Sequence, residues 1–324
     1  MKTAFLFPGQ GAQVVGMGAD IAAAFPEAEA VFQEADKIVG FDLSKLCFEG
    51  PAVQLNTTTI SQPAIFVTSA AILEVLRTSP NTNNIKPDAT AGLSLGEYTA
   101  LYSAGVISFE DALTLVKKRG ESMQAAAEST EGGMVSIIGL DEPTIRLLCE
   151  EASGGELLVP VNFNCPGQIV ISGAKAACER AEHLAEKYGA MKAVRLEVAG
   201  AFHTERMAGA AESLKQAIGD SEISEPANVR IVANITGEYY RSAKEIADGL
   251  VKQLTSPILW KKCMEKLLSD GVERFYEIGP GRVLTGLMRR INKKADVINL
   301  STLDSLKGLV TIGEQAGFHV KPIG

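Results

Sequence analysis

The chain contains the pentapeptide Gly92-Leu93-Ser94-Leu95-Gly96, in which a serine has a glycine two residues away on each side. Residues 88–91 ahead of it are typical of a short buried strand, and residues 97–102 continue as a helix that Gly105 can stop. A sharp turn between a strand and a helix exposes a serine as a nucleophile and leaves no room for Cβ atoms at the flanking glycines. The alternative is an ordinary glycine-rich turn whose serine has no chemical role.

Strands and helices alternate in the segments on both sides of this turn. Such alternation is typical of a mainly parallel sheet that helices cover on both faces. The strands that we expect in this sheet are Thr3–Phe7, Ala89–Ala91, Val229–Asn234 and Arg274–Ile278. We therefore predict an α/β fold with a hydrolase-like sheet domain, because the strand, the exposed serine and the helix follow one another as in that class.

A different pattern interrupts this alternation in the middle of the chain. Its order is strand, helix, strand, strand, helix, strand, which is the order of a ferredoxin-like unit. The six segments are 134–140, 142–152, 157–161, 168–172, 174–188 and 193–198. Because the last segment leads directly into a helix of the first pattern, we expect a smaller inserted α+β domain at 128–198 and a discontinuous catalytic domain at 1–127 and 199–324.

The bulk composition excludes several classes of protein. The chain has 324 residues, 46% apolar and 22% charged, which is ordinary for a soluble globular protein with a sizeable core. Its formal net charge of −8 argues against a nucleic-acid partner. No apolar run approaches the ~20 residues that span a bilayer, and the N-terminal apolar stretch is too short for a signal peptide. Five scattered cysteines without metal or disulfide spacing fit a reducing compartment, so we expect a cytoplasmic protein with no metal site and no membrane partner.

A serine nucleophile needs a base, and histidine is the usual one. Of the three histidines, His183 lies in a charged helical segment typical of a solvated face, and His319 lies close to the end of the chain, where order is often poor. His203 follows a predicted strand at the start of a helix, where α/β folds usually place functional groups. We therefore favour His203 as the base for Ser94, against a buried histidine bonded to a backbone carbonyl. Such a base also predicts that activity varies across neutral pH.

The helix predicted from Ser108 carries a charged side chain within its apolar stripe. Arg119 lies in register with the apolar positions of that helix, whereas Lys117 and Lys118 point elsewhere. A buried guanidinium is costly unless it is paired, and its planar fork suits a carboxylate. The partner is either an internal Asp or Glu or the carboxylate of a substrate.

The segment Phe7-Pro8-Gly9-Gln10-Gly11 forms a turn after the first predicted strand. Glycines on both sides of Gln10 free its backbone N–H to point at a ligand. A serine acyl-transfer enzyme needs such a donor beside the amide of the residue after the nucleophile. Gln10 and Leu95 are therefore the candidates for an oxyanion hole.

Further motifs follow in one order along nearly the whole chain. They are FPGQG at 7–11, GLSLGEYTAL at 92–101, KKRGESMQ at 117–124, NFNCPGQIVISG at 162–173, GAFHTERM at 200–207, QLTSPILW at 253–260 and EIGPG at 277–281. In these motifs the chain closely resembles the malonyl-CoA:acyl carrier protein transacylases of fatty-acid synthesis and the related acyltransferase domains of polyketide synthases.

The resemblance implies a role for each matching residue. Ser94 would carry the acyl group, His203 would be its general base, and Arg119 would bind the free carboxylate of malonyl. The oxyanion-hole roles would fall to the two backbone donors already named. Gln253 matches a family glutamine near the active site, where a backbone carbonyl rather than an acidic side chain orients the histidine, so no triad acid is expected.

Two neighbours of the reacting residues bear on the acyl group. In the related polyketide domains, phenylalanine at the position of Phe202 goes with malonyl rather than methylmalonyl units, because the ring would occupy the space of the extra methyl. A methyl group in a pocket changes the binding free energy by only ~1–3 kcal/mol, so this is a preference.

Leu93 departs from the family, most of whose members have histidine there. The pair of Ser94 and His203 should stay intact.

The resemblance implies a ping-pong malonyltransferase whose partners are malonyl-CoA and an acyl carrier protein. No cofactor is expected, since the coenzyme A thioester is itself a substrate. A serine esterase or thioesterase is the alternative, because the same pair of residues would serve water; Arg119 favours an acyl group that bears a carboxylate. A non-catalytic scaffold is the third interpretation.

An acidic carrier protein needs a local positive surface to dock on an acidic chain. The candidates are a first patch of Arg289, Arg290, Lys293 and Lys294 and a second patch of Lys261 and Lys262. The alternative for either patch is a solvated helix face.

Overall fold

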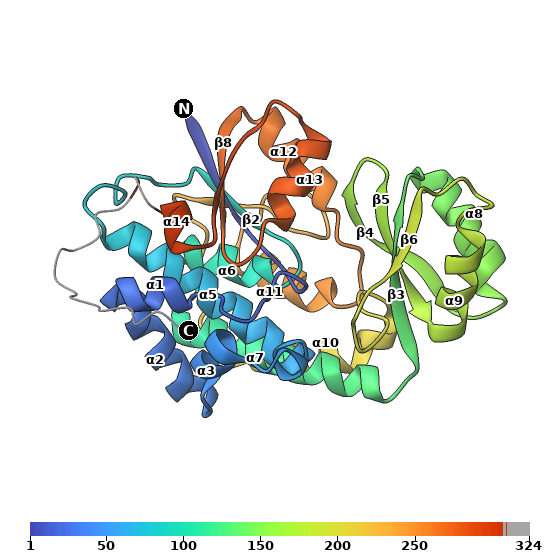
Figure 1. Ribbon diagram of the computed structural model, residues 1–324, viewed down its shortest axis with the longest axis horizontal. Coiled ribbons are helices and arrows are strands. Elements are labelled where there is room, and N and C mark those ends of the chain that lie inside the picture. Colours follow the sequence, from blue (N-terminus) through green and yellow to red (C-terminus); the bar gives the residue numbers. More distant parts are fainter. Residues whose placement is uncertain (307–308, 310–324) are drawn as a thin grey trace, which may run out of the picture.

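Two β-sheets organise residues 1–306 and 309, the part of the chain described by the computed structural model (Figure 1). Within these residues, the larger sheet has five parallel strands in the order β7 (Arg230–Ile231), β2 (Ala89–Gly92), β1 (Lys2–Phe7), β8 (Val272–Ile278) and β9 (Asp296–Leu300). The smaller sheet has four antiparallel strands in the order β4 (Leu158–Cys165), β5 (Gln168–Ala174), β3 (Gly132–Ile138) and β6 (Lys192–Arg195). The predicted fold class, a mainly parallel sheet with a smaller ferredoxin-like unit, is confirmed.

Helices cover both faces of the larger sheet, as the alternation of residues in β1 requires. Phe5 and Phe7 belong to one apolar cluster, and Ala4 and Leu6 belong to another. The helices of the first cluster are α1 (Ala19–Ala24), α2 (Pro26–Val39), α3 (Leu43–Glu49), α4 (Ala52–Leu55), α5 (Thr58–Thr78), α6 (Gly96–Ser103), α7 (Phe109–Glu128), α10 (Ala208–Gly219), α11 (Ala243–Gln253) and α14 (Leu303–Leu306). Those of the second are α12 (Trp260–Ser269) and α13 (Val283–Ile291).

Helix α5 is the central core helix of this domain. Its 21 residues have a mean hydropathy of 1.5 over the most apolar window, so by length and composition it could cross a membrane, and 83% of that window is buried inside the protein. From the sequence we expected no apolar stretch of this length. The α5 stretch is apolar on nearly all sides because α2, α6 and α7 pack around it.

The smaller sheet carries its helices on one face. Helices α8 (Glu142–Ser153) and α9 (Lys175–Leu184) pack on it around a third apolar cluster. Figure 1 shows this unit on the right, beside the larger sheet. Strand β4 joins it to the larger domain, since the backbone N–H of Ile258 donates to Val161 O at 2.7 Å and that of Phe163 donates to Ile258 O at 2.9 Å. The domain bounds at 128 and 198 stay a prediction.

Two strands of the larger sheet differ from expectation. The strand predicted to reach Asn234 ends as β7 at Ile231, because the chain folds back on itself and Val232 pairs with Tyr239. Strand β9 was not predicted; it lies at the sheet edge and is only partly buried, so its residues lack a clear alternation of apolar and polar side chains.

The turn between β2 and α6 lies directly against β1. A Cβ built on Gly96 would lie 2.1 Å from the Phe7 carbonyl oxygen, and one on Gly92 would lie 1.9 Å from the backbone of Gly96. Only glycine fits at these two positions, because the obstructing atoms are backbone. The two glycines are therefore needed, as predicted, because the turn packs too closely against its surroundings for a Cβ atom.

The Gly96→Ala substitution should lower the free energy of unfolding by at least about 1–3 kcal/mol, because the crowding cannot be relieved by a side-chain rotation. Urea denaturation followed by circular dichroism measures this change. Gly286→Ala is the matched control: Gly286 is exposed in α13, a Cβ there meets nothing within 4 Å, and alanine should stabilise the helix by up to about 1 kcal/mol. Equal unfolding free energies for the wild type and Gly96→Ala would contradict the packing argument.

Candidate active site

Ser94 lies in the turn after β2 with a backbone conformation that few non-glycine residues adopt. Its φ is 51°, and within residues 1–306 the only other non-glycine residue with a positive φ is His203, at 61°. Such a backbone costs about 1–3 kcal/mol and persists only where its surroundings hold it. Asn234 holds the turn: its Oδ1 accepts from the Ser94 N–H at 2.7 Å, and its Nδ2 donates to the Gly92 carbonyl at 2.7 Å.

Ser94 and His203 form a hydrogen-bonded pair. Ser94 Oγ lies 3.0 Å from His203 Nε2, and His203 Nδ1 lies 2.8 Å from the backbone oxygen of Gln253. A carbonyl can only accept, so the ring proton is on Nδ1 and Nε2 can accept from the serine hydroxyl. Burial, followed by the positive charge of Arg119, lowers the pKa of His203 to about 3. The imidazole is therefore neutral near pH 7, and the expected change of activity across neutral pH no longer follows from this residue.

Arg119 reaches the same point from α7. It is only 1% exposed, and its guanidinium donates to Gln62 Oε1 at 2.7 Å, to Gln253 Oε1 at 2.8 Å and to Ser94 Oγ at 2.9 Å. In the described part of the chain, none of its hydrogen-bond acceptors is a carboxylate, and its Nε has no acceptor. The internal acid that we considered as its partner is therefore not in direct contact, and the guanidinium charge faces the nucleophile.

A buried carboxylate that the sequence analysis missed lies behind these residues. Glu97 Oε1 accepts from the Asn234 N–H and from the Tyr240 hydroxyl, and its Oε2 accepts from Gln253 Nε2. Burial raises the pKa of Glu97 to about 7, although these donors and the charge of Arg119 oppose the shift. One signal in the sequence was a charged residue three positions after Ser94, in a helical segment that is otherwise apolar or small.

A cleft of about 360 Å³ opens beside the nucleophile. Met134 of β3 and Asn162 of β4, both in the smaller sheet, line it together with the turns that follow β1 and β2. Residues from the sequence analysis that line it are Gln10, Leu93, Ser94, Phe202 and His203. The cleft therefore lies between the turns after β1 and β2 and residues of the smaller sheet.

The two residues expected to form the oxyanion hole differ in how their side chains lie relative to the cleft. Gln10 lines the cleft, whereas the side chain of Leu95 is buried in the core. Among the described residues, the backbone N–H of neither one donates to a protein acceptor. Both amides are thus available to a ligand, and their role stays a prediction.

His183 does not line the cleft. His183 is exposed on α9, and His319 lies outside the described residues. No group of three or more His, Cys, Asp or Glu side chains that could hold a metal occurs in the part of the chain searched.

The two basic patches are partly engaged within the protein. In the first, Arg290 donates to Gln168 Oε1 and to the carbonyls of Pro166 and Gly167, so it ties α13 to the turn between β4 and β5. Arg289, Lys293 and Lys294 are exposed.

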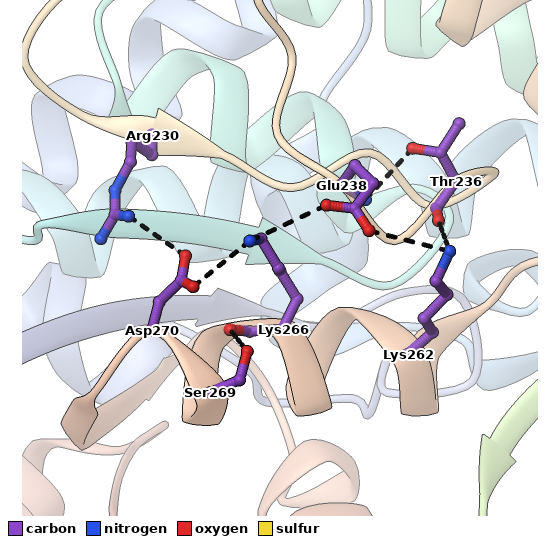
Figure 2. Close-up of polar contacts among 7 residues, drawn as sticks. All are labelled: Arg230, Thr236, Glu238, Lys262, Lys266, Ser269 and Asp270. Carbon is purple, nitrogen blue, oxygen red and sulfur yellow. Dashed lines mark hydrogen bonds and ion pairs between the residues drawn. The ribbon is translucent and has the colours of Figure 1, made fainter.

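The second patch belongs to a mixed network of charges. Lys262 donates to the Thr236 carbonyl at 2.6 Å and lies 3.9 Å from Glu238. Figure 2 shows this contact continuing through Lys266 and Asp270 along one face of α12. Because acidic groups alternate with basic ones there, the second patch is a weaker candidate for an acidic partner.

The sequence matches a known family model over most of its length. Residues 4–307 match the acyl transferase domain. The malonyl CoA-acyl carrier protein transacylase of Bacillus subtilis is 42% identical over 307 residues, covering 94% of this chain and 95% of that protein. The protein of the same name from Escherichia coli K12 is 44% identical over 301 residues, covering 93% and 95%.

Solved structures agree with these sequence matches. An acyl carrier protein S-malonyltransferase from Vibrio cholerae superimposes with a TM-score of 0.89 at 40% identity, covering 94% of this chain and 99% of that one. A malonyl-transacylase in complex with its type II PKS acyl-carrier protein superimposes with a TM-score of 0.89 at 41% identity, covering 94% and 98%. The chain therefore belongs to the acyl transferase domain family and, within it, to the malonyl CoA-acyl carrier protein transacylases.

Proposed function

We propose that this protein moves a malonyl group from coenzyme A to the phosphopantetheine thiol of an acyl carrier protein, through a malonyl ester of Ser94. The observation that carries the proposal is the hydrogen bond from Arg119 Nη2 to Ser94 Oγ, because it puts a positive charge beside the atom that would hold the acyl group. Malonyl ends in a carboxylate close to its thioester carbonyl, within reach of that charge. The names of the relatives, and the complex with an acyl-carrier protein, support the same substrates.

In the first half-reaction, His203 Nε2 takes the hydroxyl proton while Ser94 Oγ attacks the thioester carbonyl carbon. The carbonyl oxygen becomes negative and would accept from the N–H groups of Gln10 and Leu95. When the C–S bond breaks, the imidazolium gives its proton to the departing thiolate of coenzyme A. The products are the malonyl ester and a neutral histidine.

The second half-reaction runs the same steps with a new thiol. His203 takes the proton of the phosphopantetheine thiol, and the sulfur attacks the ester carbonyl of Ser94. The C–O bond breaks and the serine oxygen recovers the proton from the imidazolium. The Gln253 carbonyl holds the same ring orientation in both directions, because it accepts from Nδ1 throughout.

The acyl group is selected at its two ends. Arg119 favours a free carboxylate, since its acceptors among the described residues are all uncharged and a charge-assisted hydrogen bond is stronger. Phe202 lines the cleft next to His203, which is consistent with a preference for malonyl over bulkier acyl groups.

The proposed reaction needs no cofactor and takes place in a reducing compartment. No metal or cofactor takes part in these steps, and coenzyme A is a substrate. Fatty-acid synthesis in the cytoplasm is the proposed setting, and the five buried free cysteines are compatible with a reducing compartment.

Malonyl-CoA should add the mass of one malonyl group to the wild-type protein and none to Ser94→Ala, because the substitution removes the nucleophilic oxygen. Intact-protein mass spectrometry makes this comparison. His203→Ala should slow both half-reactions, since the serine then lacks its base. A malonyl label found on a cysteine would contradict the assignment of Ser94.

Holo acyl carrier protein should remove the malonyl group from the labelled enzyme and gain the same mass, whereas buffer alone should release malonate slowly. This separates a transferase from a serine hydrolase, for which water is the natural acceptor. Mass spectra of both proteins over time measure the two rates. Release into buffer at the rate seen with carrier protein would favour the hydrolase.

Arg119→Ala should lower kcat/KM for malonyl-CoA by about 10- to 100-fold or more, the effect of losing a charge-assisted hydrogen bond. Loading from acetyl-CoA should be comparatively unharmed or improved. The ratio of the two kcat/KM values is the quantity to measure, with circular dichroism to verify folding. An equal loss for both substrates would assign Arg119 a structural role.

A further inference from the structure

Glu97 is a buried acidic residue that the mechanism above does not use. It lies in the first turn of α6 and is 0% exposed. Three donors point at its two oxygens: the Asn234 N–H at 3.1 Å, the Tyr240 hydroxyl at 2.9 Å and Gln253 Nε2 at 2.5 Å. An ionised carboxylate accepts all three, whereas a protonated one has to donate with one oxygen.

These contacts fix which way the side-chain amide of Gln253 faces. Its Nε2 donates to Glu97 and also to the Ser94 carbonyl at 2.9 Å, so its Oε1 is left facing Arg119 Nη2 at 2.8 Å. With the amide turned over, its NH₂ group would face the guanidinium, and two donors would oppose each other. Glu97, together with the Ser94 carbonyl, therefore holds Gln253 so that it presents an acceptor to Arg119.

The negative charge of Glu97 also offsets the positive charge of Arg119 within the buried site. Arg119 has no carboxylate among its direct acceptors in the described residues, yet the two groups interact electrostatically across the Gln253 amide. A buried cation is less costly when an anion lies near it. Because the anion lies behind the amide, the guanidinium keeps one face for the nucleophile and its acyl group.

We propose that Glu97 is a positioning residue whose ionised carboxylate fixes the Gln253 amide and thereby aims Arg119 at the acyl group on Ser94. The inference rests on the proposed function, since aiming Arg119 matters only for an acyl group that bears a carboxylate. The same residue, Gln253, also supplies the backbone carbonyl that orients His203, so one residue contacts both the base and the carboxylate-binding group.

Glu97→Gln tests this directly, because a glutamine has one acceptor oxygen for three donors. Its NH₂ group either opposes Gln253 Nε2 or opposes the N–H of Asn234, whereas the Tyr240 hydroxyl can turn to accept. Turning the Gln253 amide over relieves the first conflict and presents an NH₂ group to Arg119. The ratio of kcat/KM for malonyl-CoA over acetyl-CoA should then fall by about 10- to 100-fold, the effect of a lost hydrogen bond to a charged group. This ratio does not depend on the fraction of enzyme that is folded.

Glu277→Gln is the matched control. Glu277 is also 0% exposed and also accepts several hydrogen bonds, from Leu284 and Thr285 at the start of α13 and from Asn299. It does not line the cleft. This substitution should lower stability as Glu97→Gln does, and leave the malonyl to acetyl ratio unchanged.

The pH profile gives a second readout that a merely structural role would not move. With the pKa of Glu97 raised to about 7 by burial, kcat/KM for malonyl-CoA should fall as the pH is lowered through neutrality and the carboxylate takes a proton. The other titratable groups that face it are Arg119, Tyr98, Tyr240 and Cys263, and burial holds the pKa of each tyrosine and of the thiol above its ordinary value. His203 stays neutral in this range. The acid limb should be present in Glu277→Gln and absent from Glu97→Gln.

The outcomes separate this inference from the proposed function. A wild type that takes no label from malonyl-CoA overturns the proposed function. A wild type that is labelled, with the same malonyl to acetyl ratio in Glu97→Gln, overturns only the role of Glu97, as does an acid limb that persists in that variant. If Glu97→Gln yields no folded protein, Glu97→Asp replaces it, because shortening the side chain by one methylene withdraws the carboxylate from Gln253 Nε2; an unchanged ratio there overturns the role of Glu97.

Discussion

A dehydrated positive charge beside the nucleophile is the constraint around which this site is built. Removing a guanidinium from water costs several kcal/mol unless its donors are satisfied, and here two glutamine oxygens and one hydroxyl accept three of its hydrogen bonds while Nε has no acceptor. Those acceptors come from α5, from α11 and from the turn after β2, so these elements have to converge on α7 at one point. The exclusion of water that makes Arg119 costly is also what lowers the pKa of the neighbouring histidine.

The sequence was sufficient for the fold class because its signals are local. Two glycines around Ser94 predicted the elbow, and periodicity predicted both the parallel sheet and the inserted antiparallel one. The pairing of Ser94 with His203 followed from chemistry and from the small number of histidines. Arg119 was found because it lies in the apolar stripe of its helix, where a charged side chain has to be buried and therefore needs a partner.

The remainder of the site could not be read from the sequence, because it depends on side chains that meet only after folding. Glu97 and Asn234 are far apart in the chain and both are buried, yet neither lies in a pattern that predicts their contact. Whether the partner of Arg119 was internal stayed open for the same reason. Strand β9 was missed because an edge strand needs no regular alternation.

The backbone link between β4 and Ile258 has a mechanical consequence. The same short stretch, residues 253–258, begins at the carbonyl that holds the His203 ring and ends at the residue bonded to the smaller domain. Between the two hydrogen-bonded ends, only five residues of backbone separate the smaller sheet from the carbonyl that accepts from the imidazole. The position of the smaller sheet and the orientation of the His203 ring are therefore set by one short, hydrogen-bonded stretch of backbone.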